Sequence, residues 1–258
     1  MYHPFSIADT IKTAWKVIKE NYVILIVFTM VTFLGEMAKD ALSVYFSQYS
    51  VTAQILGAQI ISIVATYLTL SFYKLLLTLI DKEYYEFEFK DILPSFKMVC
   101  YAVLIVIVFR IIYQTLLFID FRIVKNGFLL YFLLLVEAIA IVYFLIRLIF
   151  CLCFIVDDDS GPLESLQQSF AITKNNFFKL LSMVLIVFGF VALILLVVNG
   201  IITIFVEQNK ALDAYLIEFG AILWFAITFP TVQVAIITTY RKLVYSHKDV
   251  DDDVSETL

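Results

Sequence analysis

The sequence predicts an all-α polytopic membrane protein with six transmembrane helices. Its composition is the first reason, because 62% of the 258 residues are apolar and 16% are charged, against about 45–50% and about 25% in soluble domains. The second reason is a series of six stretches of roughly 20 mainly apolar residues, a length that crosses a bilayer as a helix. The third is the presence of 25 phenylalanines and 15 tyrosines, which suit a lipid-facing surface with amphipathic rings at its borders.

We place a single transmembrane domain at residues 1–248 and a disordered acidic tail at 249–258. No cleavable signal peptide is expected, because Pro4 and alternating lysines stand where an apolar segment is required. The first span is the least regular, since Glu36 and Lys39 interrupt it and either end it or line a polar interior. The spans are expected at about 22–43, 53–80, 98–119, 128–156, 178–206 and 214–243.

The positions of lysine and arginine predict the orientation. The loops on the side of the N-terminus carry most of these residues: Lys12, Lys16, Lys19, Lys82, Lys90, Lys97, Lys174, Lys179, Arg241, Lys242 and Lys248. The opposite side carries four: Lys39, Arg122, Lys125 and Lys210. By the positive-inside rule both termini lie in the cytoplasm. The formal net charge of −5 gives no reason to expect a nucleic-acid partner.

Three cytoplasmic segments are predicted to be interfacial amphipathic helices, at about 6–21, 87–97 and 162–176. The first places an apolar face opposite a basic face: Ile7, Ile11, Trp15 and Ile18 opposite Lys12, Lys16 and Lys19. The last opens at Gly161 and Pro162 and carries Phe170 and Lys174. Such helices place apolar side chains in the headgroup region and lysines toward anionic lipid, so we expect membrane lipids as partners.

The first and last of these segments can be aligned with each other, residues 7–25 with 162–180. The alignment pairs similar residues: Trp15 with Phe170, Lys19 with Lys174, Asn21 with Asn176, Tyr22 with Phe177 and Leu25 with Leu180. It predicts three units at a period of roughly 75–80 residues, each an interfacial helix followed by a helical hairpin. A second interpretation is equally open, because interfacial helices share aromatic and lysine preferences for physical reasons.

Residues 147–181, RLIFCLCFIVDDDSGPLESLQQSFAITKNNFFKLL, resemble the glycerophosphodiester phosphodiesterase membrane-domain family and related uncharacterised bacterial six-helix proteins. The positions that carry the resemblance run from a late-helix arginine to a threonine–lysine pair: Arg147, Asp158 or Asp159, Gly161, Pro162, Ser165, Ser169, Thr173 and Lys174. The opening PFSIADTIKTAWKVIKENY looks like the N-terminal helix of the family. The resemblance implies a bacterial inner-membrane protein that has the membrane part of such enzymes without their soluble catalytic domain.

No constellation of catalytic or metal-ligating residues is visible in the sequence. Its only histidines are His3 and His247, near the two ends, so a site built from several histidines is not expected. The acidic run 157–159 is either a weak cation or headgroup site or, as we prefer, a solvated turn that favours the next helix N-terminus. We therefore expect no metal, no cofactor and no enzymatic activity.

Four ionisable residues lie inside predicted spans: Lys74, Arg110, Glu137 and Arg147. Charges at bilayer depth are costly, so they normally face a bundle interior or a wet cavity. Helix rise places Arg110 and Glu137 at similar levels, which predicts that they form an ion pair. Lys74 is expected to reach the interface along its own stem. Arg147 is left to hold an anion or a lipid phosphate, to which its fork of donors is suited.

Two functions follow from these residues. The first, which we prefer, is a non-enzymatic membrane module whose interfacial helices and polar interior bind lipid or a partner membrane protein. The second is a small transporter or export protein with a polar cavity around Arg110, Glu137 and Arg147. An intramembrane lipid enzyme is the weakest candidate, because the sequence offers no nucleophile with a base and no metal set. The oligomeric state does not follow from the sequence.

Overall fold

The computed structural model describes residues 6–81, 89–120, 127–208 and 213–255, and within these ranges it contains helices and no strand. The helices are α1 (Ile7–Glu20), α2 (Tyr22–Ser47), α3 (Val51–Asp81), the 3₁₀ turn η1 (Phe89–Ile92), α4 (Phe96–Phe118), α5 (Gly127–Leu148), α6 (Cys151–Asp157), α7 (Pro162–Lys174), α8 (Phe177–Gln208) and α9 (Asp213–Ser255). Six of the resulting stretches are long and apolar enough to cross a membrane: Tyr22–Ser47, Val51–Asp81, Lys90–Phe118, Gly127–Asp157, Phe177–Ile204 and Leu216–Val244. The predicted all-helical class and the six long apolar helices are confirmed.

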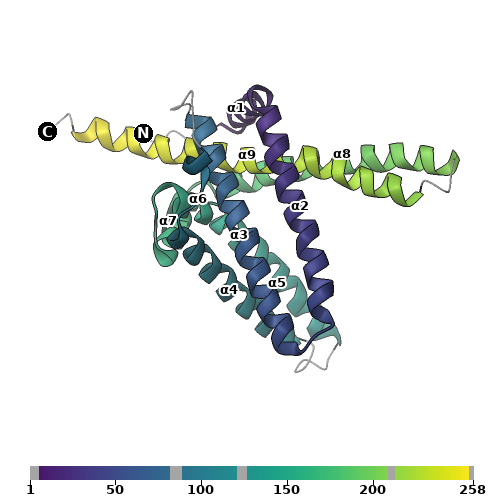
Figure 1. Ribbon diagram of the computed structural model, residues 1–258. Coiled ribbons are helices and arrows are strands. Elements are labelled where there is room, and N and C mark those ends of the chain that lie inside the picture. Colours follow the sequence, from purple (N-terminus) through teal and green to yellow (C-terminus); the bar gives the residue numbers. More distant parts are fainter. Residues whose placement is uncertain (1–5, 82–88, 121–126, 209–212, 256–258) are drawn as a thin grey trace.

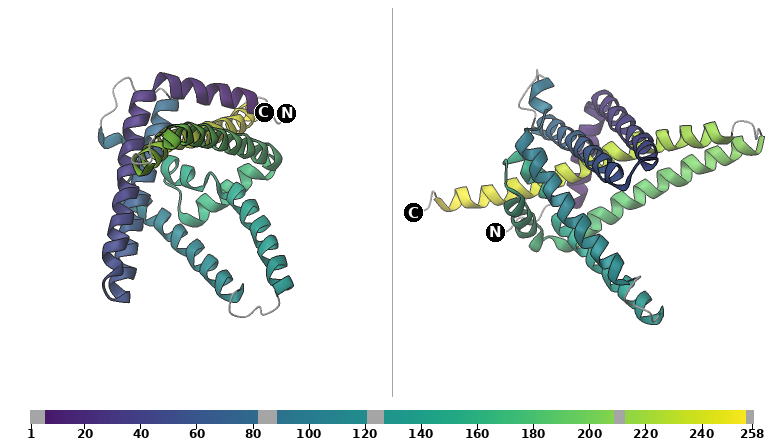
Figure 2. Two further views of the ribbon diagram at one scale, coloured as in Figure 1. Left: turned by 90° about the vertical axis from the view of Figure 1, so that its right-hand side faces the viewer. Right: turned by 60° about the horizontal axis from the view of Figure 1, so that its bottom comes forward.

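The long helices spread outward from one end of the molecule, which we call the base and define by α1, η1, α6 and α7 (Figure 1). From the base, α2 with α3 and α4 with α5 run downward in Figure 1, while α8 and the first half of α9 run to the side. Two further views show the same splayed arrangement (Figure 2). The second half of α9 crosses the base, and α9 contacts α1, α2 and α3.

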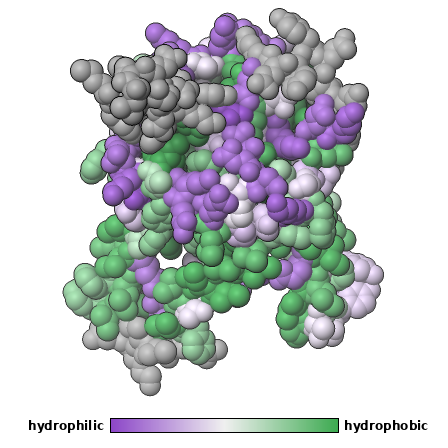
Figure 3. Space-filling view, turned by 90° about the vertical axis from the view of Figure 1, so that its left-hand side faces the viewer, coloured by the Kyte–Doolittle hydropathy of each residue, from purple (hydrophilic) through white to green (hydrophobic). Residues whose placement is uncertain are grey.

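The hydrophobic core lies in the base and in the adjacent halves of the long helices. Leu70 to Leu77 of α3, Ile146 to Val156 around α6, and Val234 to Leu243 of α9 contribute most of its buried side chains. The distant halves of the helices expose large apolar side chains to their surroundings, for example Phe128 and Leu196. A space-filling view shows polar residues gathered over the base and apolar columns below it, with a hollow between them (Figure 3).

Helix α1 packs across the base on a narrow face of small residues. Thr10, Ala14 and Val17, one turn apart, are buried, and α9 is the helix that α1 contacts most extensively. Ser6 caps the helix, since its side chain accepts a hydrogen bond from the Asp9 N–H. Trp15 remains 55% exposed. The buried strip is therefore displaced from the predicted apolar face, of which Ile7 and Ile18 are partly buried while Ile11 and Trp15 are exposed.

One sequence prediction about the base is wrong. An interfacial α-helix was expected at 87–97, but the structure has only η1 and then Ser95, which caps α4; residues 87 and 88 lie outside the described residues. Pro94 accounts for the interruption, because it disfavours a helical conformation at the residue before it. The fourth span, expected over 128–156, is present as Gly127–Asp157, and the helix is interrupted within it between α5 and α6.

Helix α9 continues to Ser255, into the acidic segment that the sequence predicts to be disordered. Adding a residue to an existing helix costs much less than starting one, so a long helix readily extends into a polar segment. Disorder of residues 249–258 stays a prediction, and residues 256–258 lie outside the described part.

The two segments aligned in sequence have similar local structures. Thr10 of α1 and Ser165 of α7 occupy equivalent positions and are both fully buried. Each helix ends at an asparagine step into a long helix, where Leu25 and Leu180 are 1% and 2% exposed. The third segment, around η1, lacks this arrangement. The likeness thus concerns the two aligned segments, and the repeat of three units stays a prediction.

We expect Gly57→Val to destabilise the packing of α2 on α3. A Cβ atom at Gly57 would overlap the ring of Phe46, so the ring would have to move, at a cost of about 1–3 kcal/mol in the free energy of unfolding. Titration with a denaturing detergent, followed by circular dichroism, measures this change. Gly189→Val is the matched control, because nothing lies within 4 Å of a Cβ there. Equal stability of the two variants would contradict the close approach.

Candidate functional site

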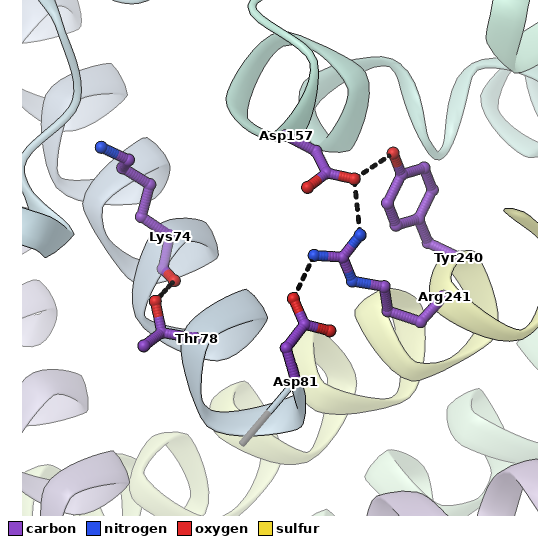
Figure 4. A network of polar contacts seen from close by, with 6 residues as sticks. All are labelled: Lys74, Thr78, Asp81, Asp157, Tyr240 and Arg241. Atoms are coloured by element: carbon purple, nitrogen blue, oxygen red, sulfur yellow. Dashed lines mark hydrogen bonds and ion pairs between the residues drawn. The ribbon is translucent and has the colours of Figure 1, made fainter. Parts of the chain in front are cut away.

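The base contains a network of charged residues centred on Arg241 (Figure 4). Arg241 Nη1 donates to Asp157 Oδ2 at 2.6 Å, and Nη2 contacts a carboxylate oxygen of Asp81. Tyr240 donates its hydroxyl proton to the same Asp157 oxygen at 2.9 Å. The three charged side chains are only 12–18% exposed. The network therefore joins the ends of α3 and α6 to α9.

A cavity of about 170 Å³ lies beside this network and is lined by Lys74, Leu77, Thr78, Asp81, Val156, Asp157 and Arg241. Its charged residues balance, with two cations and two carboxylates. The Lys74 amine points away from Arg241 in Figure 4 and donates to the Leu93 carbonyl at 3.0 Å. Lys74 thus links α3 to the loop before α4 by a hydrogen bond. The sequence had predicted instead that its side chain extends to the membrane interface.

A second polar cluster surrounds Arg147 at the end of α5. Its Nη1 donates to Thr173 Oγ1 at 3.2 Å. The guanidinium carbon lies 5.0 Å from the ring centroid of Phe170 and 5.7 Å from that of Tyr143, within the range of cation–π contacts. The Nε atom is buried and has no acceptor among the described residues. The cluster therefore holds the flat guanidinium by one hydroxyl and two rings.

The same cluster explains the break between α5 and α6. In an unbroken helix the Arg147 carbonyl would accept a hydrogen bond from the N–H of Cys151. Instead Ser169 Oγ donates to that carbonyl at 2.8 Å, and Cys151 Sγ lies 3.2 Å from Ser165 Oγ. Ser165, Ser169 and Thr173 are fully buried along one face of α7. Hydroxyl groups of α7 thus satisfy polar groups that the break leaves open.

Arg147 has no acidic partner among the residues that the structure describes. This distinguishes it from Arg241, whose charge is neutralised by two carboxylates. Thr173 and the aromatic rings orient the guanidinium but carry no formal charge. An anion is therefore the ligand that the cluster can bind with a net electrostatic gain.

The predicted ion pair between Arg110 and Glu137 is wrong. No ion pair or hydrogen bond of Arg110 is found within the described part of the chain, and its side chain is exposed on α4. The ionisable side chain that Glu137 contacts is Asp120, another carboxyl group. Helices α4 and α5 barely touch, because α7 packs against both of them at the base. Similar levels on two helices do not bring side chains together when the helices diverge.

The three aspartates of the run 157–159 do not form one site. Asp157 belongs to the Arg241 network, while Asp159 accepts a hydrogen bond from Lys97 at 2.7 Å. Within the described ranges, no three His, Cys, Asp or Glu side chains are placed to hold a metal ion. Asp159 has a positive φ of 52°, so this residue makes the reversal that leads into α7. The run thus organises the base instead of forming a cluster of carboxylates.

The residues predicted to meet lipid lie on α1 and α7. Lys12, Lys16, Lys19 and Lys174 are exposed at the base. Trp15 and Ile11 line an apolar cavity of about 180 Å³ between α1, α8 and α9. Phe170 instead packs beside Arg147, so the structure places it with the anion-compatible cluster.

Comparison with known proteins leaves the chain unassigned. No family model, no curated protein and no solved structure matches it. The residues that carry the resemblance noted above, Arg147, Ser165, Ser169 and Thr173, do meet in one cluster.

We expect Arg241→Gln to lower the free energy of unfolding by about 2–4 kcal/mol, because Asp81 and Asp157 would keep their charges without a cation in a mostly buried position. Adding Asp81→Asn and Asp157→Asn should recover most of the loss. Thermal unfolding in mild detergent measures both changes. Lys97→Gln is the matched control, since its pair with Asp159 is about half exposed and such pairs contribute little. A triple variant as unstable as Arg241→Gln would contradict the role of the network.

The contact between Lys242 and Asp9 predicts a pH dependence. The hydrogen bond and the positive charge of Lys242 lower the pKa of the Asp9 carboxyl. A lowered pKa stabilises the docked state of α1 above the ordinary aspartate pKa, and this contribution disappears as the pH falls through the lowered value. The protection of the α1 amides from hydrogen exchange, relative to the intrinsic exchange rate at each pH, should therefore fall at acid pH in the native protein. Asp9→Asn should remove that part of the dependence, and an unchanged profile would contradict it.

Proposed function

We propose that the chain is a non-enzymatic, multi-pass protein of the bacterial inner membrane that binds anionic lipid headgroups at its base, with both termini in the cytoplasm. The observation that carries the lipid site is Arg147, whose guanidinium is fixed by Thr173 and two rings yet has no carboxylate near it in the described chain. A phosphate oxygen is the natural acceptor for such a fork of donors.

Membrane insertion is supported by the distribution of side chains. The six long helices are apolar, and 11–39% of each most apolar window is buried inside the protein. The remaining apolar side chains need an apolar solvent, which a bilayer supplies. The base carries the exposed lysines of α1 and α7, so the positive-inside rule places it in the cytoplasm.

The level of Arg147 fits a headgroup. Thr173 and Phe170 belong to the last turns of α7, and the long apolar helix α8 begins only three residues after Lys174. Arg147 therefore lies where the apolar zone gives way to the polar base, the depth of lipid phosphates. Lys12, Lys16, Lys19 and Lys174 would add attraction for anionic lipid, and Trp15 a ring at the interface.

A transporter with a cavity around Arg110, Glu137 and Arg147 receives less support. Arg110 is exposed on α4, Glu137 faces Asp120 and Arg147 packs against α7. The four cavities described for this protein are lined by other residues. Lipid binding at one arginine requires only the cluster around Arg147.

Native mass spectrometry of the full chain in mild detergent tests the proposal, with added phosphatidylglycerol or phosphatidylcholine as probes. We expect phosphatidylglycerol to bind preferentially and Arg147→Ala to weaken it about tenfold or more, the effect of losing one charge-assisted contact. Arg147→Lys should show an intermediate loss, because it keeps the charge and loses the fork.

The matched control is Arg110→Ala, which removes the same side chain from an exposed position of α4. It should leave phosphatidylglycerol binding unchanged. Equal losses in the two variants would indicate a general effect of charge. Unchanged binding in Arg147→Ala, together with an intact melting curve, would exclude the Arg147 site.

A further inference from the structure

An apolar cavity of about 220 Å³ lies between α8, α9 and the junction of α5 with α6. Its lining is apolar apart from Thr239, whose hydroxyl donates to the Ala235 carbonyl of its own helix at 2.6 Å. Protein interiors contain few voids larger than a water molecule, and an apolar cavity of roughly 150 Å³ already stays free of water and takes up benzene. This cavity therefore suits an apolar ligand.

The length of the cavity matches the chains of one membrane leaflet. Its lining on α8 follows one face from Leu180 to Val191, a distance of about 16 Å along the helix axis. On α9 the lining runs alongside, from Thr239 to Val232. The hydrocarbon core of a bilayer is about 30 Å thick, so the acyl chains of one leaflet fill about 15 Å of it. One acyl chain laid along α8 would thus extend over the whole cavity.

The end of the cavity nearest the base adjoins the Arg147 cluster. Ile149 lines the cavity and follows Arg147 by two residues, so their Cα atoms are at most about 8 Å apart. A second connection leads to the same place, because Phe177, three residues before Leu180, has its ring centroid 5.3 Å from that of Tyr143, which contacts the guanidinium. From this end, α8 and the first half of α9 lead away from the base (Figure 1).

The size of the cavity decides between an acyl chain and a partner helix. A helix about 10 Å across would occupy roughly 1,200 Å³ over the same length, several times the volume of the cavity. A hydrocarbon chain is much thinner. Phe188 lines the cavity and is 69% exposed, so the cavity reaches the surface that we assign to the bilayer, where lipid chains surround the protein.

We propose that this cavity binds one acyl chain of the anionic phospholipid whose phosphate binds Arg147. The glycerol of such a lipid joins its phosphate to its chains, just as the cavity begins beside the arginine. The protein would then recognise its lipid by headgroup charge and by chain together. This inference rests on the proposed function, because the headgroup contact is the one assigned there to Arg147.

The test places the full-length protein in liposomes that contain a small fraction of phosphatidylglycerol with a photoreactive diazirine in the middle of one acyl chain. After illumination, mass spectrometry of peptides locates the adducts. The readout is the ratio of adducts on two cavity walls, Val184 and Val232, to adducts on two exposed positions of α8, Leu185 and Leu196. We expect this ratio to be higher than with the same diazirine on phosphatidylcholine, which carries no net charge.

Two variants separate the chain contact from the headgroup contact. Val184→Trp fills the cavity with an indole ring, so the excess of adducts at Val232 should disappear while labelling of the exposed positions continues. Arg147→Ala should lower that excess about tenfold, the effect of losing one charge-assisted contact. Val197→Trp is the matched control, because it makes the same substitution at a position of α8 that is 50% exposed, and it should leave the ratio unchanged.

Three outcomes would overturn the proposal. The first is a native protein whose ratio is the same for both lipids, the second is an excess that Val184→Trp leaves intact, and the third is an excess that Arg147→Ala leaves intact. Native mass spectrometry reports the headgroup site separately. Phosphatidylglycerol binding that still depends on Arg147 would then leave the lipid site standing without the chain site. Binding that does not depend on Arg147 would reject the headgroup site and, with it, the chain site as assigned.

Discussion

The pairing of Arg241 with Asp81 and Asp157 is the interaction on which the base depends. A mostly buried guanidinium is tolerated only with its counter-charges in place, so α3 and α6 must end where α9 presents Arg241. Tyr240 adds a second link between α9 and α6, because its ring centroid lies 5.0 Å from that of Phe154 and its hydroxyl donates a hydrogen bond to Asp157. With α6 fixed in this way, the turn that follows it places α7 against the end of α5.

The hydroxyl face of α7 then decides what happens to Arg147. The Ser169 hydroxyl donates a hydrogen bond to the Arg147 carbonyl at the helix break. The Thr173 hydroxyl accepts a hydrogen bond from the guanidinium of the same arginine. One short helix thus satisfies the backbone and orients the side chain of the same residue. Apolar residues in place of these hydroxyls would leave buried polar groups without partners, which proteins rarely tolerate.

Hydropathy could predict the six long apolar helices, because it is a property of contiguous residues. The break after Leu148 could not be predicted in this way, since the apolar run is continuous and the interruption is stabilised by a hydroxyl 22 residues away from Arg147. The Arg241 network was missed because Asp157 and Asp81 lie 84 and 160 residues before Arg241 in the chain, beyond the reach of any local pattern. Arg147 and the hydroxyl residues of α7 could each be singled out from the sequence, but their contact could not, and the predicted pairing of Arg110 with Glu137 failed because helix rise gives no lateral position.

The concentration of the core in the base has a consequence for the distant halves of the hairpins. Most side chains there lie outside the buried cluster, and α4 and α5 barely touch, so the hairpins can change their tilt about the base with little effect on that cluster. A bilayer that thickens or thins changes the tilt at which a helix of fixed length matches it. In this architecture, hydrophobic mismatch would be absorbed separately by each hairpin, and the spread of the helices would follow the thickness of the membrane around them.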